Sequence, residues 1–288
     1  MAIQETGASD GAPARLASGL MKTWLITGCS SGFGREIATA ARAHGDNVVA
    51  TARRAETLAD LDAVHVALDV TRQDHIDAAI QTTLDRFGRI DVLVNNAGIG
   101  SVGAVEMIEM DHLRALMDTM FFGAVALTQA VLPHMRAQGE GAIVQMSSMG
   151  GQVVYPGYGA YCAAKFALEA MSEALAYETS PLGIRVLIVE PGAFRTALLG
   201  TTMHRSPEIE VYDNTAGATR RAAEAMDGRQ AGDPRKLAEA IIEALESDHP
   251  PLRLALGGDA VEAIRASQHA RRRDLDGWEA VSRATDLD

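Results

Sequence analysis

The sequence predicts an α/β fold in which one doubly wound parallel sheet of about seven strands is covered by helices on both faces. Segments with strand-like and helix-like patterns alternate along the 288 residues. The strand-like segments are continuous apolar runs, which is typical of parallel strands buried on both faces. There is no internal repeat and no shift of composition, so we expect a single folded domain.

Seven short apolar runs are predicted to be the strands, because most of them are followed by Gly, Pro, Asn, Asp or Ser, which favour turns. They cover residues 23–27, 47–52, 64–68, 90–94, 142–146, 184–189 and 252–256. The spacing of these runs leaves room for a helix in most of the connections, as a parallel sheet requires.

Six segments between the runs are predicted to be helices from their composition and period. They cover residues 35–44, 55–61, 73–87, 111–137, 161–179 and 234–247. The segment 73–87 places Ile76 and Ile80 on one face, and Gly88 closes it. Pro133 is expected to kink the helix 111–137 or to end its regular part. Residues 193–232 are polar and mixed, without a clear period.

The two ends of the chain differ from its middle. Residues 1–20 are rich in Gly, Ala, Ser and Asp and lack the charged and apolar regions of a signal peptide, so we expect a flexible N-terminal extension. Residues 21–257 hold the alternating segments and form the predicted domain. The charged tail 258–288 is expected to be partly helical and to pack on the same domain.

The composition excludes several classes of function. A net charge of −12 argues against a nucleic-acid or anionic-membrane surface. Cys29 and Cys162 form no C-x-x-C pair, which favours a reducing, cytoplasmic location. No apolar run approaches the roughly 18 residues of a membrane span. The eight His residues show no metal-ligand spacing, so no metal site is expected.

A glycine-rich turn follows the first predicted strand and precedes the first helix. It reads Thr27-Gly28-x-x-x-Gly32-x-Gly34. Glycines let the backbone turn sharply and approach a pyrophosphate, while the helix N-terminus offers amide donors. The position therefore predicts a Rossmann-type dinucleotide site, although a glycine-rich turn without a ligand is the alternative.

The end of the second predicted strand indicates which dinucleotide would bind. An NAD site usually has an acidic side chain about 20 residues after the glycines. Here Arg53 and Arg54 follow the strand, and no carboxylate occurs until Glu56. An arginine can bind a 2′-phosphate bidentately, so we favour NADP(H) over NAD(H). The alternative is a solvated arginine pair at a helix start.

Tyr161 and Lys165 are four residues apart on a predicted helix and so share one face of it. A free phenol has a pKa of about 10 and is a poor acid or base at neutral pH. A lysine ammonium one turn away is expected to lower that pKa, which would make the pair an acid/base unit. Taken alone, such a pair can equally be an ordinary surface pair.

The set of motifs resembles the short-chain dehydrogenase/reductase family. It comprises the glycine-rich turn, Asn95-Asn96-Ala97-Gly98, Ser148, Tyr161-x-x-x-Lys165 and Pro191-Gly192. The match runs from about residue 22 to 196, and more loosely to 257. Each motif alone is weak, but all five occur in the expected order, each at the carboxyl end of a predicted strand.

The resemblance implies catalytic roles for three residues. Ser148 lies 13 residues before Tyr161, the usual separation in the family. Its hydroxyl would orient the substrate carbonyl, Tyr161 would give a proton to the developing alkoxide, and Lys165 would bind the nicotinamide ribose. The resemblance also implies a set of cofactor-binding residues: Gly28, Ser30, Ser31, Gly32, Phe33, Gly34, Arg53, Asp69, Val70, Asn95, Ala97, Gly98, Tyr161, Lys165, Pro191, Gly192 and Thr196.

One position departs from the family pattern. The family commonly has an asparagine in the long helix before the fifth strand, where it helps to hold a water molecule that links the lysine to solvent. Met120 occupies that position here. The replacement affects the expected proton relay rather than the hydride chemistry.

The expected function is an NADP(H)-dependent oxidoreductase that acts on a carbonyl/alcohol pair, in the direction of reduction. A small-molecule substrate is expected to enter over Tyr161, between residues 155–157 and 194–212. Homodimers or homotetramers would form through the helices 111–137 and 161–179, as is common in the family. The alternatives are an epimerase or dehydratase on the same scaffold and a dinucleotide sensor without turnover. Met120 favours the sensor, whereas the three catalytic-type residues argue against it.

Overall fold

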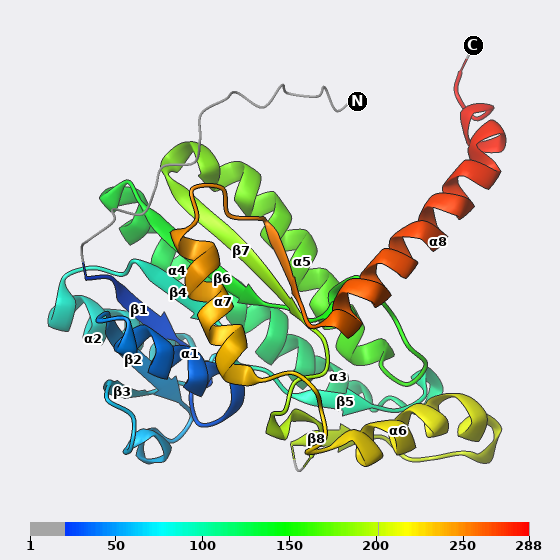
Figure 1. Ribbon diagram of the computed structural model, residues 1–288, viewed down its shortest axis with the longest axis horizontal. Coiled ribbons are helices and arrows are strands. Elements are labelled where there is room, and N and C mark those ends of the chain that lie inside the picture. The colour runs from blue at the N-terminus through cyan, green and yellow to red at the C-terminus, as the bar shows by residue number, and fades with distance from the viewer. Residues whose placement is uncertain (1–20, 201, 288) are drawn as a thin grey trace.

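The computed structural model describes residues 21–200 and 202–287, so the extension predicted for residues 1–20 lies outside it. Its centre is a seven-stranded sheet with the order β3-β2-β1-β4-β6-β7-β9, in which all paired strands are parallel (Figure 1). The strands are β1 (Thr23–Ile26), β2 (Asn47–Ala52), β3 (Val64–Ala67), β4 (Val92–Asn95), β6 (Gly141–Met146), β7 (Ile184–Pro191) and β9 (Arg253–Leu256). The predicted fold class is confirmed, and the seven strands lie close to their predicted ranges.

Helices cover both faces of this sheet. The α-helices of the described residues are α1 (Gly32–Ala43), α2 (Gln73–Phe87), α3 (Met110–Met117), α4 (Gly123–Gln138), α5 (Gly159–Thr179), α6 (Ala218–Met226), α7 (Pro234–Glu246) and α8 (Gly258–Arg283). Of these, α1, α2, α4, α5 and α7 contribute to the two cores against the sheet. On one face, Ile37 of α1 and Ile241 of α7 pack into a core with β1 and β2. On the other face, Ile76 of α2 and Leu127 of α4 belong to a second core. The continuous apolar strands are thereby buried on both sides.

The strand order places the candidate site. The chain runs outward from β1 to β3 on one side of the sheet and from β4 to β9 on the other, so the order reverses between β1 and β4. Ligands of open α/β sheets bind at this point, beyond the carboxyl ends of the strands. The glycine-rich turn after β1 and the Asn95–Gly98 turn after β4 meet there, where Thr27 N–H donates to the carbonyl of Val94 at 3.0 Å.

The long helix predicted for residues 111–137 is built from three pieces. Between α3 and α4 lies one π-helical turn, Asp118–Phe122, which contains Met120. Pro133 does not end the helix, because α4 continues to Gln138. Among the described residues this continuous helix, Met110–Gln138, is the one that by length and composition could cross a membrane, since an 18-residue window in it has a mean hydropathy of 1.5. The expectation that no segment has these properties is therefore wrong, although Leu127 on its inner face is fully buried against the sheet.

Residues 193–232 are more regular than the sequence indicates. They contain α6 and a short strand, β8 (Met203–Arg205), which pairs in parallel with β5 (Gly100–Val102). This two-stranded sheet was not predicted, because three-residue strands carry too little pattern to be recognised. It attaches the segment after β7 to the segment after β4.

Helix α8 leaves the body of the protein and carries the C-terminus away from it (Figure 1). Ala260 and Ile264 in its first turns are buried. Its later turns are exposed, and Trp278 has 66% of its surface accessible.

Candidate active site

The glycine-rich turn adopts a backbone that requires glycine. Gly28 has φ +71° and Gly32 has φ +61°, which are left-handed values that side chains disfavour. A Cβ on Gly34 would lie 2.5 Å from Nδ2 of Asn96 and 2.6 Å from the carbonyl oxygen of Gly28. Helix α1 begins at Gly32, so its free amide groups face the end of β1. The turn therefore has the form that a pyrophosphate needs.

Asn96 holds this turn in place, a role that the sequence reasoning did not assign. Its Nδ2 donates to the carbonyl oxygens of Thr27 at 2.8 Å and Gly28 at 3.2 Å. Asn95, the predicted residue, points into the protein instead and donates to Thr128 at 3.1 Å and Gln145 at 3.1 Å. Successive residues at the end of a strand point in opposite directions, and this alternation is the signal that could have separated the two asparagines.

A cleft of about 780 Å³ lies above these turns. Most of the predicted cofactor residues line it together: Gly28, Ser30, Ser31, Gly32, Phe33, Arg53, Asp69, Val70, Ala97, Gly98, Tyr161, Lys165 and Thr196. The other four predicted cofactor residues do not line it: Gly34, Asn95, Pro191 and Gly192. Such a volume, with glycine at the close approach, fits an extended dinucleotide.

Arg53 and Asp69 lie at the same end of the cleft. Arg53 is exposed directly after β2. Asp69 accepts hydrogen bonds from the Thr71 hydroxyl at 2.7 Å and the Thr71 amide at 3.0 Å. Burial acts to raise the pKa of Asp69, but these bonds and the charge of Arg53 outweigh it, and the pKa is lowered. This end of the cleft therefore offers both an anion and a cation to a ligand.

Two of the three predicted catalytic residues, Tyr161 and Lys165, line the other end of the cleft, whereas Ser148 lies beside Tyr161 without lining it. Ser148 ends the segment after β6, where its hydroxyl accepts from the amide of Gly150 at 3.0 Å. The Ser148 hydroxyl also lies within hydrogen-bonding reach of Tyr161. Lys165, one turn further along α5, donates to the carbonyl oxygen of Met146 at 2.6 Å and lies 5.8 Å from the centre of the Tyr161 ring.

The pKa of Tyr161 moves in the direction opposite to the one expected. Burial raises it to about 12, and the hydrogen bond with Ser148 opposes the rise without overcoming it. Burial lowers the pKa of Lys165 to about 8, against the charge of Glu169. The spacing correctly placed the lysine near the tyrosine, but its ammonium is held by Met146, and loss of solvent around the phenol has the larger effect.

Met120 is buried, with 2% of its surface exposed, and packs with Leu116 and Ala164 against the ring of Tyr161. It lies in the π-helical turn, where the widened ladder changes the spacing of the backbone carbonyls. The family departure thus occurs in direct contact with the catalytic helix.

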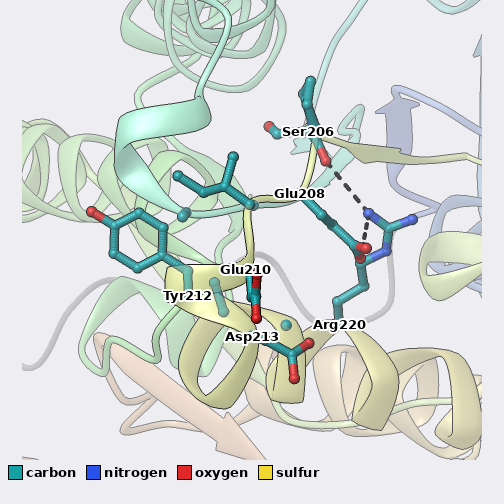
Figure 2. A pocket seen from close by; sticks show the side chains of 12 residues that line it. Ser206, Glu208, Glu210, Tyr212, Asp213 and Arg220 are labelled. Atoms are coloured by element: carbon teal, nitrogen blue, oxygen red, sulfur yellow. Dashed lines mark hydrogen bonds and ion pairs between the residues drawn. The ribbon is translucent and has the colours of Figure 1, made fainter.

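The segment expected to cover the substrate contributes to two hollows. Leu198 and Thr202 line the large cleft. A second pocket of about 200 Å³ lies between Ala104 and the segment 206–220 (Figure 2). In Figure 2, Arg220 points across this pocket, where it forms an ion pair with Glu208 at 2.8 Å and donates to the carbonyl of Ser206 at 3.4 Å.

Within the described part of the chain, no group of three or more His, Cys, Asp or Glu side chains could hold a metal ion. The arrangement instead combines a dinucleotide-shaped cleft with a hydroxyl that can orient a carbonyl and a phenol that can donate a proton. These groups are suited to proton transfer that accompanies hydride transfer.

Comparison with known proteins supports this interpretation. Residues 22–206 match the family model for short chain dehydrogenases. Oxidoreductase BOA17 of Botryotinia fuckeliana is 38% identical over 273 residues, which cover 92% of this chain and 100% of that protein. A crystal structure of a short-chain dehydrogenase from Streptomyces avermitilis has 49% identity and a TM-score of 0.88, and covers 94% of this chain and 100% of its own.

A third relative is named after its substrate and was solved with a cofactor bound. It is the 3-ketoacyl-(acyl-carrier-protein) reductase from Brucella melitensis, whose crystal structure was solved with NADH. Its identity is 30% and its TM-score is 0.71, with 83% of this chain and 98% of that chain covered. The extent of the family match and of these similarities leads to one conclusion: the chain belongs to the short-chain dehydrogenase/reductase family and is an oxidoreductase.

Proposed function

We propose that the protein reduces a ketone or aldehyde with NADPH as the hydride donor. The observation that carries this proposal is the position of Tyr161 and Lys165, with Ser148 beside Tyr161, at one end of the cleft whose other end holds Arg53. When bound, the dinucleotide supplies the hydride. Oxidation of NADPH by a panel of ketones and aldehydes tests the proposal, and a protein that binds NADPH but reduces none of them would contradict it.

Side chains of the protein would orient and protonate the carbonyl oxygen of the substrate. The Ser148 hydroxyl would donate a hydrogen bond to that oxygen and orient it. The Tyr161 hydroxyl would transfer its proton as negative charge develops there. With a pKa of about 12, Tyr161 stays protonated near neutral pH, which suits a proton donor and therefore the direction of reduction. Lys165 would bind the ribose through its ammonium group.

The choice of NADPH over NADH rests on the surroundings of β2. Arg53 is the exposed cation at that end of the cleft, and its guanidinium can bind a 2′-phosphate bidentately. Asp69 lies beyond the next strand and is held by Thr71. The relative from Brucella melitensis was solved with NADH, so the family alone does not decide between the dinucleotides.

Replacing Arg53 by Ala is expected to weaken NADPH binding by about 1.5–3 kcal/mol, the value of a hydrogen bond to a charged group, and to leave NADH binding little changed. Titration of both dinucleotides into both proteins measures this. Arg54→Ala is the matched control, because Arg54 is also exposed but does not line the cleft. An equal loss for both dinucleotides, or a wild type that prefers NADH, would show that Arg53 does not bind the phosphate.

The sensor alternative depends on Met120. A thioether is a weak acceptor, so Met120 cannot replace an asparagine amide in holding a water molecule. We propose that carbonyl groups in the π-helical turn Asp118–Phe122 take over this role. The hydride step does not use position 120, so the wild type should be active.

Met120→Asn is therefore expected to change the rate by less than about tenfold, or about 1.4 kcal/mol of barrier. Steady-state rates of both proteins with NADPH, measured from about pH 6 to about pH 9, test this across the expected titration range. A wild type that is inert with every carbonyl and becomes at least about a hundredfold more active as Met120→Asn would favour the sensor.

We also propose how the protein assembles and where it is located. Met171 and Tyr177 are exposed apolar side chains on α5, one of the helices expected to pair subunits, and support a homodimer or homotetramer. The free thiols of Cys29 and Cys162 support a reducing, cytoplasmic environment. Light scattering on the purified protein would test the first proposal; a monomer would contradict it.

A further inference from the structure

Two acidic side chains are buried behind the segment that carries Ser148. Glu169 of α5 has 4% of its surface exposed, and Glu190 of β7 has 2%. Carboxylates are almost never buried to this degree unless they are paired. Neither residue lines the cleft, so the function described above does not explain them.

Both carboxyl groups accept hydrogen bonds and lie close to an arginine. The Ser147 hydroxyl donates to Oε1 of Glu169 at 2.6 Å. The side-chain amide of Gln152 donates to Oε1 of Glu190. Arg253 of β9 donates from Nε to Oε2 of Glu169 at 3.2 Å and lies 3.5 Å from Oε1 of Glu190. A Cβ on Gly151 would lie 2.0 Å from Oε1 of Glu169, so the segment 147–152 is closely fitted around this carboxyl.

The charges in this cluster do not balance if every acid is ionised. Arg253 faces three carboxyl groups, since it also donates to Glu173 at 2.9 Å. Glu173 has 41% of its side chain exposed and can be solvated. Glu169 and Glu190 cannot, and both have an oxygen within 3.5 Å of the same nitrogen, Nε of Arg253. Two carboxylates so placed, with one shared cation, favour retention of a proton between them.

Burial, together with the negative charge of Glu169, raises the pKa of Glu190 to about 7, while the bond from Gln152 and the charge of Arg253 act in the opposite direction. The proton is therefore held at mildly acidic pH and released near neutrality.

The pair connects the segments that form the active site. Glu169 lies one helical turn after Lys165, and Ser147 immediately precedes Ser148. Glu190 immediately precedes Pro191-Gly192 at the end of β7. Gln152 is in turn held by α8, where Ser267 donates to its carbonyl at 3.0 Å and Arg271 at 2.8 Å.

We propose that Glu169 and Glu190 share one proton and act as a positioning pair, which keeps the Ser148 segment, helix α5 and the end of β7 together while that proton is present. The catalytic consequence rests on the proposed function of Ser148, Tyr161 and Lys165. When the proton leaves, two buried carboxylates repel each other across the contact between α5 and β7.

The charged groups around the pair determine how far this repulsion is compensated. Arg253 faces it from β9, and Lys165 and Glu173 face it from α5. The segment 147–152 contributes uncharged donors, and Arg271 of α8 contacts the backbone of that segment rather than the carboxyl groups. The guanidinium of Arg253, already shared with Glu173, and the ammonium of Lys165, which faces Glu169, are therefore the charges that compensate the two buried carboxylates above neutrality.

The sign of the stability effect follows from the raised pKa. An acid whose pKa is higher in the folded than in the unfolded state binds more protons when folded. Its contribution to stability is complete below the unfolded value of 4.5 and is lost as the pH rises through about 7. Over this range the wild type should lose stability relative to a variant that is permanently neutral at position 190.

Glu190→Gln is that variant, since its amide can still accept from Gln152 and can donate to Glu169. Between about pH 5 and about pH 8 we expect the melting temperature of the wild type to fall relative to that of Glu190→Gln. Glu173→Gln is the matched control, because it contacts the same arginine but is half-exposed, and its melting curve should follow that of the wild type. Parallel pH dependence in the wild type and Glu190→Gln would overturn the proposal.

The effect of the pair on the active site is measured by turnover. The assay uses NADPH and the ketone that is reduced fastest in the panel of carbonyl compounds described above. Loss of a proton with a pKa of about 7 should lower kcat of the wild type about three- to fourfold between about pH 6 and about pH 7.5. Glu190→Gln should change less than about twofold over the same interval. If the stability difference appears but kcat shows no such contrast, the pair does not position the active site.

A spectroscopic measurement on the wild type tests the shared proton directly. It requires neither a folded variant nor enzyme activity. Infrared difference spectra in heavy water, recorded between mildly acidic and mildly alkaline conditions, should show a protonated carboxyl band that disappears as the pH passes about 7. Glu169→Gln should lose that band if Glu190→Gln does not fold. A wild type without the band would overturn the shared proton even if the protein reduces carbonyls as proposed.

Discussion

Replacing Tyr161 by Phe is expected to lower turnover by about 10² to 10⁴-fold, the usual contribution of general acid/base catalysis, while NADPH still binds. The substitution keeps the ring that packs against Met120 and removes the hydroxyl next to Ser148. The large effect is expected because the proposed mechanism takes its proton from this hydroxyl, which lies beside Ser148 and faces the cleft. Steady-state turnover and a fluorescence titration of NADPH measure the two effects separately.

Tyr177→Phe is the matched control for this experiment. Tyr177 lies on the same helix, but it is exposed and donates to Glu173 on the outer surface. Its loss should leave turnover within about twofold of the wild type, as expected for a surface substitution. Unchanged turnover in Tyr161→Phe would remove Tyr161 from the mechanism; loss of NADPH binding would show a role in the cleft other than proton transfer.

Replacing Trp24 by Ala should have the largest effect on stability, a loss of about 3–5 kcal/mol in the free energy of unfolding. Trp24 lies in β1 at the centre of the sheet, with 1% of its surface exposed. Its indole N–H donates to Asp46 at 2.9 Å, so the substitution also leaves a buried carboxylate with one donor fewer. Urea unfolding, followed by circular dichroism, measures the change.

The second tryptophan of the chain provides the control, since the sequence contains only two. Trp278 is largely exposed on the projecting part of α8. Trp278→Ala should change the free energy of unfolding by no more than about 0.5 kcal/mol. Equal losses in the two variants would contradict either the central position of β1 or the exposure of α8.

The alternation of strands and helices could be predicted from the sequence because each element has its own local pattern of apolar and turn-forming residues. The helix Gln73–Phe87 coincides with its predicted range, since an apolar face and a terminal glycine define it locally. The pairing of β5 with β8 was not readable. Those strands have three residues each and are separated by about a hundred positions, so no short-range pattern connects them.

In the candidate site, too, locally encoded features could be predicted and features that depend on long-range contacts could not. The motifs Gly28–Gly34 and Tyr161–Lys165 correctly predicted where a cleft lies and that the tyrosine and the lysine face it together, because each motif is compact and lies at the end of a strand or on one helix face. They did not show that Asn96 rather than Asn95 braces the glycine turn. That depends on which way each side chain points after β4.

By itself, the sequence determined the fold class, the family and which residues gather in the cleft, because these follow from local periodicity and from motifs at strand ends. Only the tertiary structure decided the electrostatics. Whether the pKa of Tyr161 rises or falls depends on how much solvent the packed helices exclude, and not on its spacing from Lys165. In the same way, Glu169, Glu190 and Arg253 lie on three separate elements. These charged groups interact only once α5, β7 and β9 are packed together, because the strength of an electrostatic interaction depends on distance in space and on burial.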